Sequence, residues 1–122
     1  LEYAGVITKF LDRLRDGKPP IIFGAGSQIR DFIHVEDVAN ANFLAMKNNV
    51  TSSHVNIGTG NSISILKLAK MMINESGLTL EPIMSEALEG DVEKSQANIE
   101  LAKREFGWTP EMQLKDWLKE II

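Results

Sequence analysis

The sequence contains no cysteine, which excludes disulfides, thiolate metal sites and cysteine nucleophiles, and which fits a cytoplasmic protein. Basic residues are scarce: 13 lysines and arginines stand against 17 aspartates and glutamates, for a net charge of −4. No run of about five basic residues occurs, so we expect no nucleic-acid surface. No apolar stretch reaches the roughly 18 residues that a membrane-spanning helix needs, so we expect no membrane partner.

A dinucleotide-binding motif is also missing. Such a motif places glycines in the pattern G-x-G-x-x-G, for a tight turn, for close approach of the pyrophosphate and for helix packing. The run Gly24–Gly26 would need its third glycine at Ile29, and Gly58–Gly60 would need one at Ile63. We therefore expect no NAD site and no other cofactor site in this chain.

The sequence also lacks the residue spacing of a metal site. The two histidines, His34 and His54, have no partner histidine, cysteine or aspartate at metal-ligand spacing. We expect both histidines to be structural and predict no metal site.

The chain does contain alternating helical and extended patterns in 122 residues, of which 43% are hydrophobic. That length fits one compact domain that buries roughly two thirds of its surface. Periodicity and turn residues predict helices at 3–15, 35–47, 65–76 and 99–106 with a last helix after them, and strands at 21–23, 31–35, 54–58 and 78–84. The fold class is therefore mixed α/β, of the α+β type, without the regular βαβ series of a complete doubly wound domain.

Residue types at the helix ends support these bounds. Ser64 is a good N-cap for the third helix and Gly77 a good residue to end it. Asn98 is placed to cap the fourth helix, and Gly107 to end it with Trp108 folding back onto its last turn.

The stretch from Pro19 to Val38 is the most informative part of the sequence. It predicts a β-hairpin in which a short apolar strand, a glycine loop and Arg30 meet at one edge. A guanidinium presents a planar fork to phosphate oxygens, and Phe23 offers a flat face, so the edge suits an anionic ligand with a ring. The alternative is a plain hairpin in which Arg30 pairs with a neighbouring carboxylate.

This stretch also carries a family resemblance. Residues 24–39, G-x-G-x-x-x-R-D-F-I-H-V-E-D-V-A, resemble a segment of the extended short-chain dehydrogenase/reductases, and UDP-glucose 4-epimerases and related nucleotide-sugar dehydratases and decarboxylases are the nearest group. The resemblance continues in order at residues 3–10, 55–60, 90–91 and 102–108. It implies that residues 1–122 are a single C-terminal, substrate-binding fragment or domain, without the N-terminal NAD-binding lobe and its Rossmann sheet.

The resemblance also implies a set of ligand residues. Arg30 matches the family arginine that binds the diphosphate of a UDP-sugar, and Ile21 and Phe23 match the strand that lies along the base. Phe32 holds an aromatic position close to that arginine. We expect Asp31 to be a structural acceptor for backbone N–H groups instead of a ligand.

Two departures from the family weaken this site. The family's catalytic Tyr-x-x-x-Lys is absent, because the one tyrosine, Tyr3, is followed four residues later by Ile7, so we predict no catalytic residue and no activity for this chain alone. Relatives commonly carry a second diphosphate arginine where this chain has Leu88, and Glu93 stands where a basic residue is frequent. Loss of one charge-assisted contact costs about 1.5–3 kcal/mol, so we expect weak binding of UDP-sugars.

Two functions therefore stand at this point. The first is the UDP-sugar-binding portion of an NAD-dependent parent enzyme, with an epimerase favoured over a dehydratase or decarboxylase. The second is a non-catalytic remnant that acts through protein association. The resemblance implies that helix 35–47 and strand 54–58 add to the missing lobe, so their uncovered apolar side chains predict a homodimer.

Overall fold

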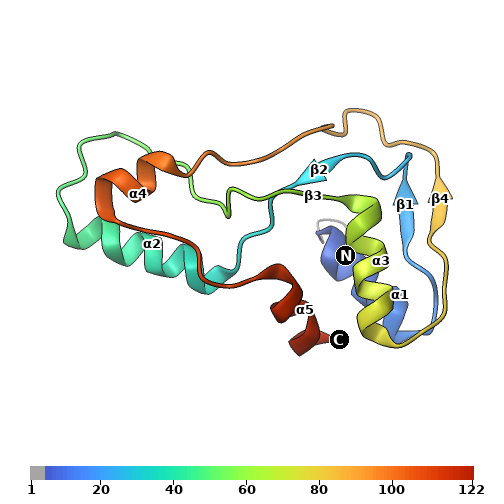
Figure 1. The fold of residues 1–122 in the computed structure, drawn as a ribbon. Helices are drawn as coiled ribbons and strands as arrows, with labels where there is room; N and C mark the ends of the chain where they lie inside the picture. The colour runs from blue at the N-terminus through green and yellow to red at the C-terminus, as the bar shows by residue number, and fades with distance from the viewer. Residues whose placement is uncertain (1–4) are drawn as a thin grey trace.

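A computed structural model describes residues 5–122 of the chain. Its elements are α1 (Val6–Arg15), β1 (Ile21–Phe23), β2 (Ile29–Arg30), α2 (Val35–Lys47), β3 (Ile63–Ser64), α3 (Ile65–Ser76), β4 (Ile83–Ser85), α4 (Glu100–Phe106) and α5 (Leu114–Ile121). This order confirms the predicted mixed α/β class. Figure 1 shows α1, α3, β1 and β4 grouped at one end and α2 with α4 at the other.

The first group surrounds the larger hydrophobic core, which we call the first core. Helix α3 supplies most of it, because its buried residues recur at helical spacing on one face. Ile22 from the middle of β1 and Leu118 from α5 are fully buried in the same cluster. Its buried members are Phe10, Leu14, Ile22, Ile65, Leu68, Ala69, Met72, Ile73 and Leu118.

The second core lies between α2 and α4. Trp108 is its largest member and is fully buried. Ala41 comes from α2, and Ala102 and Phe106 come from α4.

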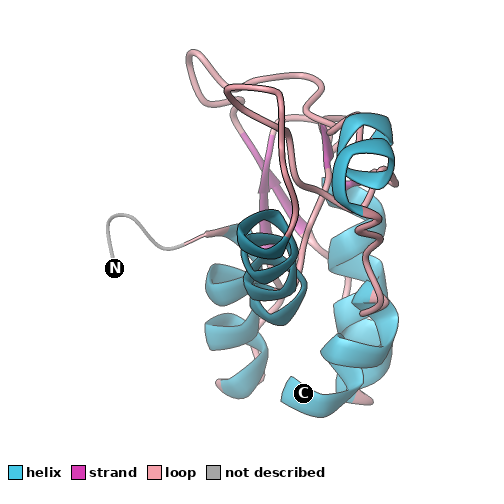
Figure 2. Cartoon of the chain, turned by 90° about the vertical axis from the view of Figure 1, so that its left-hand side faces the viewer, coloured by secondary structure: helices cyan, strands magenta, loops and turns pink. Residues whose placement is uncertain are grey.

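In Figure 2 the long connecting loops gather at the end of the molecule away from the C-terminus. None of the helices within residues 5–122 is long and apolar enough to cross a membrane.

The predicted hairpin is wrong. β1 pairs in parallel with β4, in the register Ile21↔Ile83, whereas β2 pairs antiparallel with β3, in the register Ile29↔Ser64. Gly24 and Gly26, in the segment between the two strands, have φ angles of 95° and 78°, a left-handed conformation that glycine adopts readily. The two strands thus belong to separate two-stranded sheets.

Other strand predictions also need correction. The second strand of the hairpin was expected at 31–35, but β2 covers 29–30 and α2 begins at Val35. Residues 54–58 form no strand; Val55 and Ile57 are half-buried and pack against the second core instead. β4 is shorter than the predicted strand 78–84 and ends one residue later. A strand forms only where a partner supplies hydrogen bonds, and short-range pattern does not reveal that partner.

The helix ends are predicted well. The side chain of Ser64 accepts a hydrogen bond from the backbone N–H of Lys67 at 3.1 Å, and Gly77 ends α3 with a φ angle of 74°. Gly107 ends α4 with a φ angle of 65°, and the backbone N–H of Trp108 donates to the carbonyl of Ala102 at 3.4 Å. These interactions confirm the predicted cap at Ser64 and the predicted ends at Gly77 and Gly107. The start expected for the fourth helix is one residue too early: α4 begins at Glu100 with Ile99 as its N-cap residue, and Asn98 Oδ1 accepts from the backbone N–H of Glu100 without occupying the N-cap position. The start expected for the first helix, at Tyr3, lies outside the described residues.

Candidate functional site

A cavity of about 650 Å³ opens beside α1, β1 and β2. Its size falls within the range of small-molecule sites. The four predicted ligand residues, Ile21, Phe23, Arg30 and Phe32, all contribute to its wall. The other lining residues are Val6, Lys9, Phe10, Asp12, Arg13, Gln28, Ile65, Leu88 and Asp91. The structure thus brings the four predicted ligand residues together in one cavity.

The alternation of β1 explains how its side chains reach the cavity. Successive residues of a strand point to opposite faces. Ile22 points into the first core and is fully buried, so Ile21 and Phe23 point to the other face, where they are half-buried and line the cavity. This arrangement gives the cavity an apolar, partly aromatic wall.

Arg30 is held at the cavity by two acceptors. Its Nη2 donates to Asp91 Oδ1 at 2.7 Å and its Nη1 donates to the carbonyl of Ile29 at 2.8 Å. The side chains of Arg30 and Asp91 keep 24% and 32% of their surface exposed, so water and ligands have access to the pair. A guanidinium carries five N–H donors, so donors remain for another partner. The pairing with a carboxylate, weighed above as the alternative, is therefore present within an accessible cavity.

Gln28 extends this network. Its Nε2 donates to Asp91 Oδ2 at 3.1 Å and to the carbonyl of Phe23 at 3.0 Å. Neither Gln28 nor Asp91 was predicted as a site residue. Asp91 belongs to the Gly90-Asp91 pair that contributed to the family resemblance, so a signal for it existed. Gln28 carries no comparable signal in the sequence.

Leu88 also lines the cavity and is 53% exposed. The position that departs from the family pattern therefore lies on the cavity wall and not at a remote surface. A leucine side chain cannot donate a hydrogen bond to phosphate. The wall on this side is consequently apolar at Leu88 and acidic at Asp91.

Asp31 has the structural role that we predicted. Its carboxylate accepts hydrogen bonds from the backbone N–H groups of Thr59 and Gly60, both at 2.9 Å, and from the hydroxyl of Thr59. A Cβ atom on Gly58 would lie 2.8 Å from Asp31 Oδ2 and 2.4 Å from the Cβ atom of Ala97. Glycine at position 58 thus allows the backbone to approach this carboxylate.

The glycine segments do not fit a dinucleotide. Residues 24–26 connect β1 to β2, and Gly60 precedes the two-residue strand β3. A dinucleotide loop instead joins a strand directly to a helix whose N-terminus receives the pyrophosphate. Neither glycine segment therefore lies directly between a strand and the helix that follows it, as a dinucleotide loop does.

His34 makes structural contacts at the start of α2. His34 Nδ1 accepts a hydrogen bond from the backbone N–H of Glu36 at 3.1 Å and so caps α2. Its ring meets the ring of Trp117 edge-on, with centroids 5.8 Å apart. Within residues 5–122 no group of three or more His, Asp or Glu side chains is placed to hold a metal ion.

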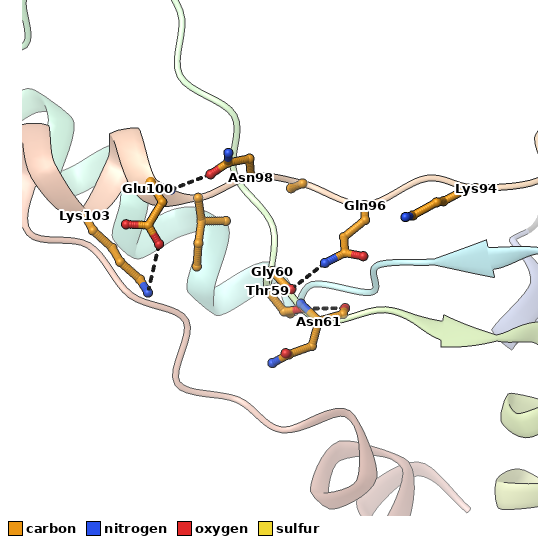
Figure 3. A pocket seen from close by; sticks show the side chains of 10 residues that line it. Thr59, Gly60, Asn61, Lys94, Gln96, Asn98, Glu100 and Lys103 are labelled. Carbon is orange, nitrogen blue, oxygen red and sulfur yellow. Dashed lines mark hydrogen bonds and ion pairs between the residues drawn. The ribbon is translucent and has the colours of Figure 1, made fainter.

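A second cavity of about 570 Å³ lies beside Gly60 and the start of α4 (Figure 3). Its polar groups largely bind one another: Gln96 Nε2 donates to the carbonyl of Gly60 at 2.7 Å, and Asn98 Oδ1 accepts from the N–H of Glu100 at 3.1 Å. Lys103 forms an ion pair with Glu100 at 3.9 Å. None of the predicted site residues lies there, so the first cavity is the candidate site.

The sequence of this chain is similar to those of known proteins. Residues 1–58, which include the predicted ligand residues, match the model of the "NAD dependent epimerase/dehydratase family". A protein of Methanocaldococcus jannaschii, described as a "Putative UDP-glucose 4-epimerase", is 40% identical over 98% of this chain. The chain belongs to the NAD-dependent epimerase/dehydratase family. It spans 38% of the length of that relative.

Solved structures of family members agree with this membership. The UDP-glucose 4-epimerase of Thermotoga maritima, solved with UDP-glucose, matches 95% of this chain and 37% of its own length, with a TM-score of 0.89 and 37% identity. A UDP-N-acetylglucosamine 4-epimerase of Methanobrevibacter ruminantium, in complex with UDP-N-acetylmuramic acid, matches 99% of this chain and 39% of its own length, with a TM-score of 0.84 and 28% identity. The chain therefore has the fold of the corresponding part of an extended short-chain dehydrogenase/reductase.

Proposed function

We propose that the cavity beside α1, β1 and β2 binds the nucleoside diphosphate of a UDP-sugar. Arg30 binds the diphosphate, Ile21 and Phe23 pack against the base, and Phe32 contributes aromatic surface next to the arginine. The observation that carries this proposal is the meeting of these four side chains in one cavity of suitable size. The solved Thermotoga maritima relative, which contains UDP-glucose, supports the choice of ligand class.

Binding is weak in this proposal, for two physical reasons. Leu88 provides no donor on its side of the cavity, and Arg30 already interacts with Asp91, so a ligand must share that guanidinium. One missing charge-assisted hydrogen bond lowers affinity by about one to two orders of magnitude.

Titration calorimetry of UDP-glucose into the wild-type chain and Arg30→Ala tests the proposal. We expect measurable binding by the wild type and a loss of about tenfold or more in Arg30→Ala, because a charged donor to phosphate is removed. Arg15→Ala is the matched control, since Arg15 is exposed in the last turn of α1 and does not line the cavity. Equal, tight binding by wild type and Arg30→Ala would show that the phosphate site is elsewhere.

The full-length relatives carry the names of enzymes. We propose that this chain alone neither epimerises UDP-glucose nor binds NAD. Support comes from the missing Tyr-x-x-x-Lys pair and from glycine segments that do not join a strand to a helix. In this proposal an NAD-binding lobe supplies the cofactor and the catalytic pair in the parent enzyme. Purified chain is expected to give no UDP-galactose from UDP-glucose and no saturable NAD binding by calorimetry; either signal contradicts the proposal.

A second candidate function, protein association, is favoured by one observation. The face of α2 opposite the second core exposes Val35, Phe43 and Met46, at 73%, 55% and 84% of their surfaces. These residues lie on one side of the helix, whereas Ala41 and Asp37 on the other side are buried. Burying a large apolar side chain contributes about 1.5–3 kcal/mol, so covering this stripe favours an interface.

We propose that this stripe, defined by Val35, Phe43 and Met46, pairs with a second copy when no NAD-binding lobe covers it. The strand edge expected at 54–58 is absent, so α2 carries the proposal by itself. Sedimentation at micromolar concentration is expected to show a dimer, and Phe43→Gln combined with Met46→Gln is expected to return the 13.6 kDa monomer. A wild-type monomer that persists after a tenfold rise in concentration rules this candidate out.

A further inference from the structure

The wall that α1 gives to the candidate site carries basic side chains. Val6, Lys9, Phe10 and Arg13 recur at intervals of three and four residues, so they share one face of the helix, and all four line the cavity. Phe10 is 2% exposed and anchors this face to the first core. The charged ends of Lys9 and Arg13 are therefore presented from a helix whose position is fixed by packing.

The basic groups around the cavity differ in their existing partners. Arg30 is bound to Asp91. Arg13 Nε donates to the carbonyl of Pro19 at 2.5 Å. For Lys9 the described part of the chain offers neither an ion pair nor a side-chain hydrogen bond, although Asp12 lies three residues further along the helix. A lysine ammonium on its four-carbon stem moves readily toward an anion and offers three donors.

We infer that Lys9 is a second cationic contact for the diphosphate of the ligand, from a different wall of the cavity than Arg30. This inference rests on the proposed function. Arg30 must share its donors between Asp91 and the ligand, and Leu88 contributes none, so one phosphate group lacks a charged partner on the β-strand side of the cavity. Lys9 supplies that charge without breaking an ion pair to any of residues 5–122. It is a binding residue in this assignment, and Arg13 a structural one.

Calorimetric titrations of UDP, UDP-glucose and uridine into Lys9→Gln test the inference. Removal of one exposed cationic contact is expected to raise the dissociation constants of UDP and UDP-glucose roughly fivefold to tenfold. Uridine, which has no phosphate, is expected to give the same signal with wild type and variant. Lys9→Arg keeps the charge and is expected to restore most of the affinity. Lys18→Gln is the matched control, because Lys18 is an exposed lysine next to α1 that does not line the cavity.

The outcomes separate this inference from the proposed function. If Arg30→Ala weakens UDP-glucose binding while Lys9→Gln and Lys18→Gln match the wild type, the assignment of Lys9 is wrong and the proposed function stands. If the wild type binds neither UDP nor UDP-glucose, the proposed function fails and the assignment of Lys9 fails with it. An equal loss for uridine and UDP in Lys9→Gln also overturns the assignment, since it shows an effect on the fold and not on phosphate. Circular dichroism of each variant checks that the helices are retained.

Discussion

The two ends of the molecule bury their apolar side chains in different ways (Figure 1). At one end, α1, β1, α3 and α5 enclose the first core, and the cavity lies on the far face of β1. At the other end, α2 packs one face against α4 and leaves an apolar stripe on its opposite face. In the functions proposed above, the two ends have different tasks: the first end surrounds a small ligand, whereas the second presents its apolar stripe to another protein surface.

The second core is also smaller and depends on fewer side chains. Among residues 5–122, nine buried residues form the first core and five form the second, two of which are alanines. The second core therefore relies on Trp108, Phe106 and Ile99 for most of its buried volume. Loss of one large residue should be felt more strongly at that end.

Two buried or half-buried carboxylates connect the ends. Asp37 accepts hydrogen bonds from the backbone N–H groups of Glu111 and Met112, both at 3.0 Å, and thereby ties the start of α2 to the segment that leads into α5. Asp31 ties the chain before α2 to the loop at 58–60. Such carboxylate contacts fix the position of one end relative to the other, because a buried charge requires its partners.

Trp108→Ala, in the second core, is expected to lower the stability of the fold more than any other substitution proposed here. Trp108 is fully buried and its Nε1 donates to the carbonyl of Asp37 at 2.9 Å, so truncation leaves a cavity and an unpaired acceptor. We expect the free energy of unfolding, measured by urea titration, to fall by about 3–5 kcal/mol. Trp117→Ala is the control, because Trp117 is only half-buried and a smaller loss is expected. A loss below about 1 kcal/mol for Trp108→Ala would show that the second core adds little stability.

Gly58→Ala is expected to have an intermediate effect by disturbing the connection between the ends. The added Cβ atom would meet the Cβ atom of Ala97 at 2.4 Å and Asp31 Oδ2 at 2.8 Å, so the backbone has to move away from its acceptor. Such overpacking costs about 1–3 kcal/mol in unfolding free energy. Gly5→Ala is the matched control, since no atom of the described residues lies within 4 Å of its added Cβ atom. Equal stability of both variants would mean that this approach is not tight in solution.

The sequence predicted the helices of both ends better than the strands. Helices 35–47 and 65–76 were predicted to the residue, because their start and stop signals, such as Ser64 and Gly77, are local. β1 was also placed correctly, but its partner β4 lies about 60 residues further along the chain, and no local pattern encodes that pairing. The expected hairpin failed for this reason.

In the candidate site, too, the residues that are close in sequence were predicted, whereas the contacts between distant residues were not. The family resemblance selected Ile21, Phe23, Arg30 and Phe32, which lie within twelve residues of sequence and meet in one cavity. Asp91 reaches Arg30 across 61 residues of sequence, and α1 contributes its basic face from before β1. These contributions depend on tertiary packing. The resemblance included Asp91 in its Gly90-Asp91 pair, but it did not reveal that Asp91 meets Arg30 or that α1 lines the cavity.

Glu105 gives a further example of a missed tertiary contact. Glu105 lies in the last turn of α4. In the structure the Glu105 carboxylate accepts hydrogen bonds from the backbone N–H and the hydroxyl of Thr51, at 3.0 Å and 2.9 Å, and from the hydroxyl of Ser52 at 2.8 Å. These bonds hold the loop that follows α2 against α4, and they lower the pKa of Glu105 below its ordinary value, the backbone bond from Thr51 having the largest influence.

The smallest expected effect is the pH dependence that Glu105 gives to the stability of the fold. It concerns the end of the molecule that contains α2 and α4. A carboxylate whose pKa is lower in the folded state than in the unfolded state stabilises the fold above its unfolded pKa, about 4.5, and this contribution disappears as the pH falls through the lower folded value. Glu105→Gln should therefore be less stable than the wild type at pH 7, with the difference shrinking below about pH 4.5. Urea unfolding at several pH values measures this, and Glu81→Gln, which removes an exposed carboxylate with no side-chain hydrogen bond among residues 5–122, is the control. A constant difference between wild type and Glu105→Gln from pH 7 to pH 3 would show that Glu105 holds the loop by its shape and not by its charge.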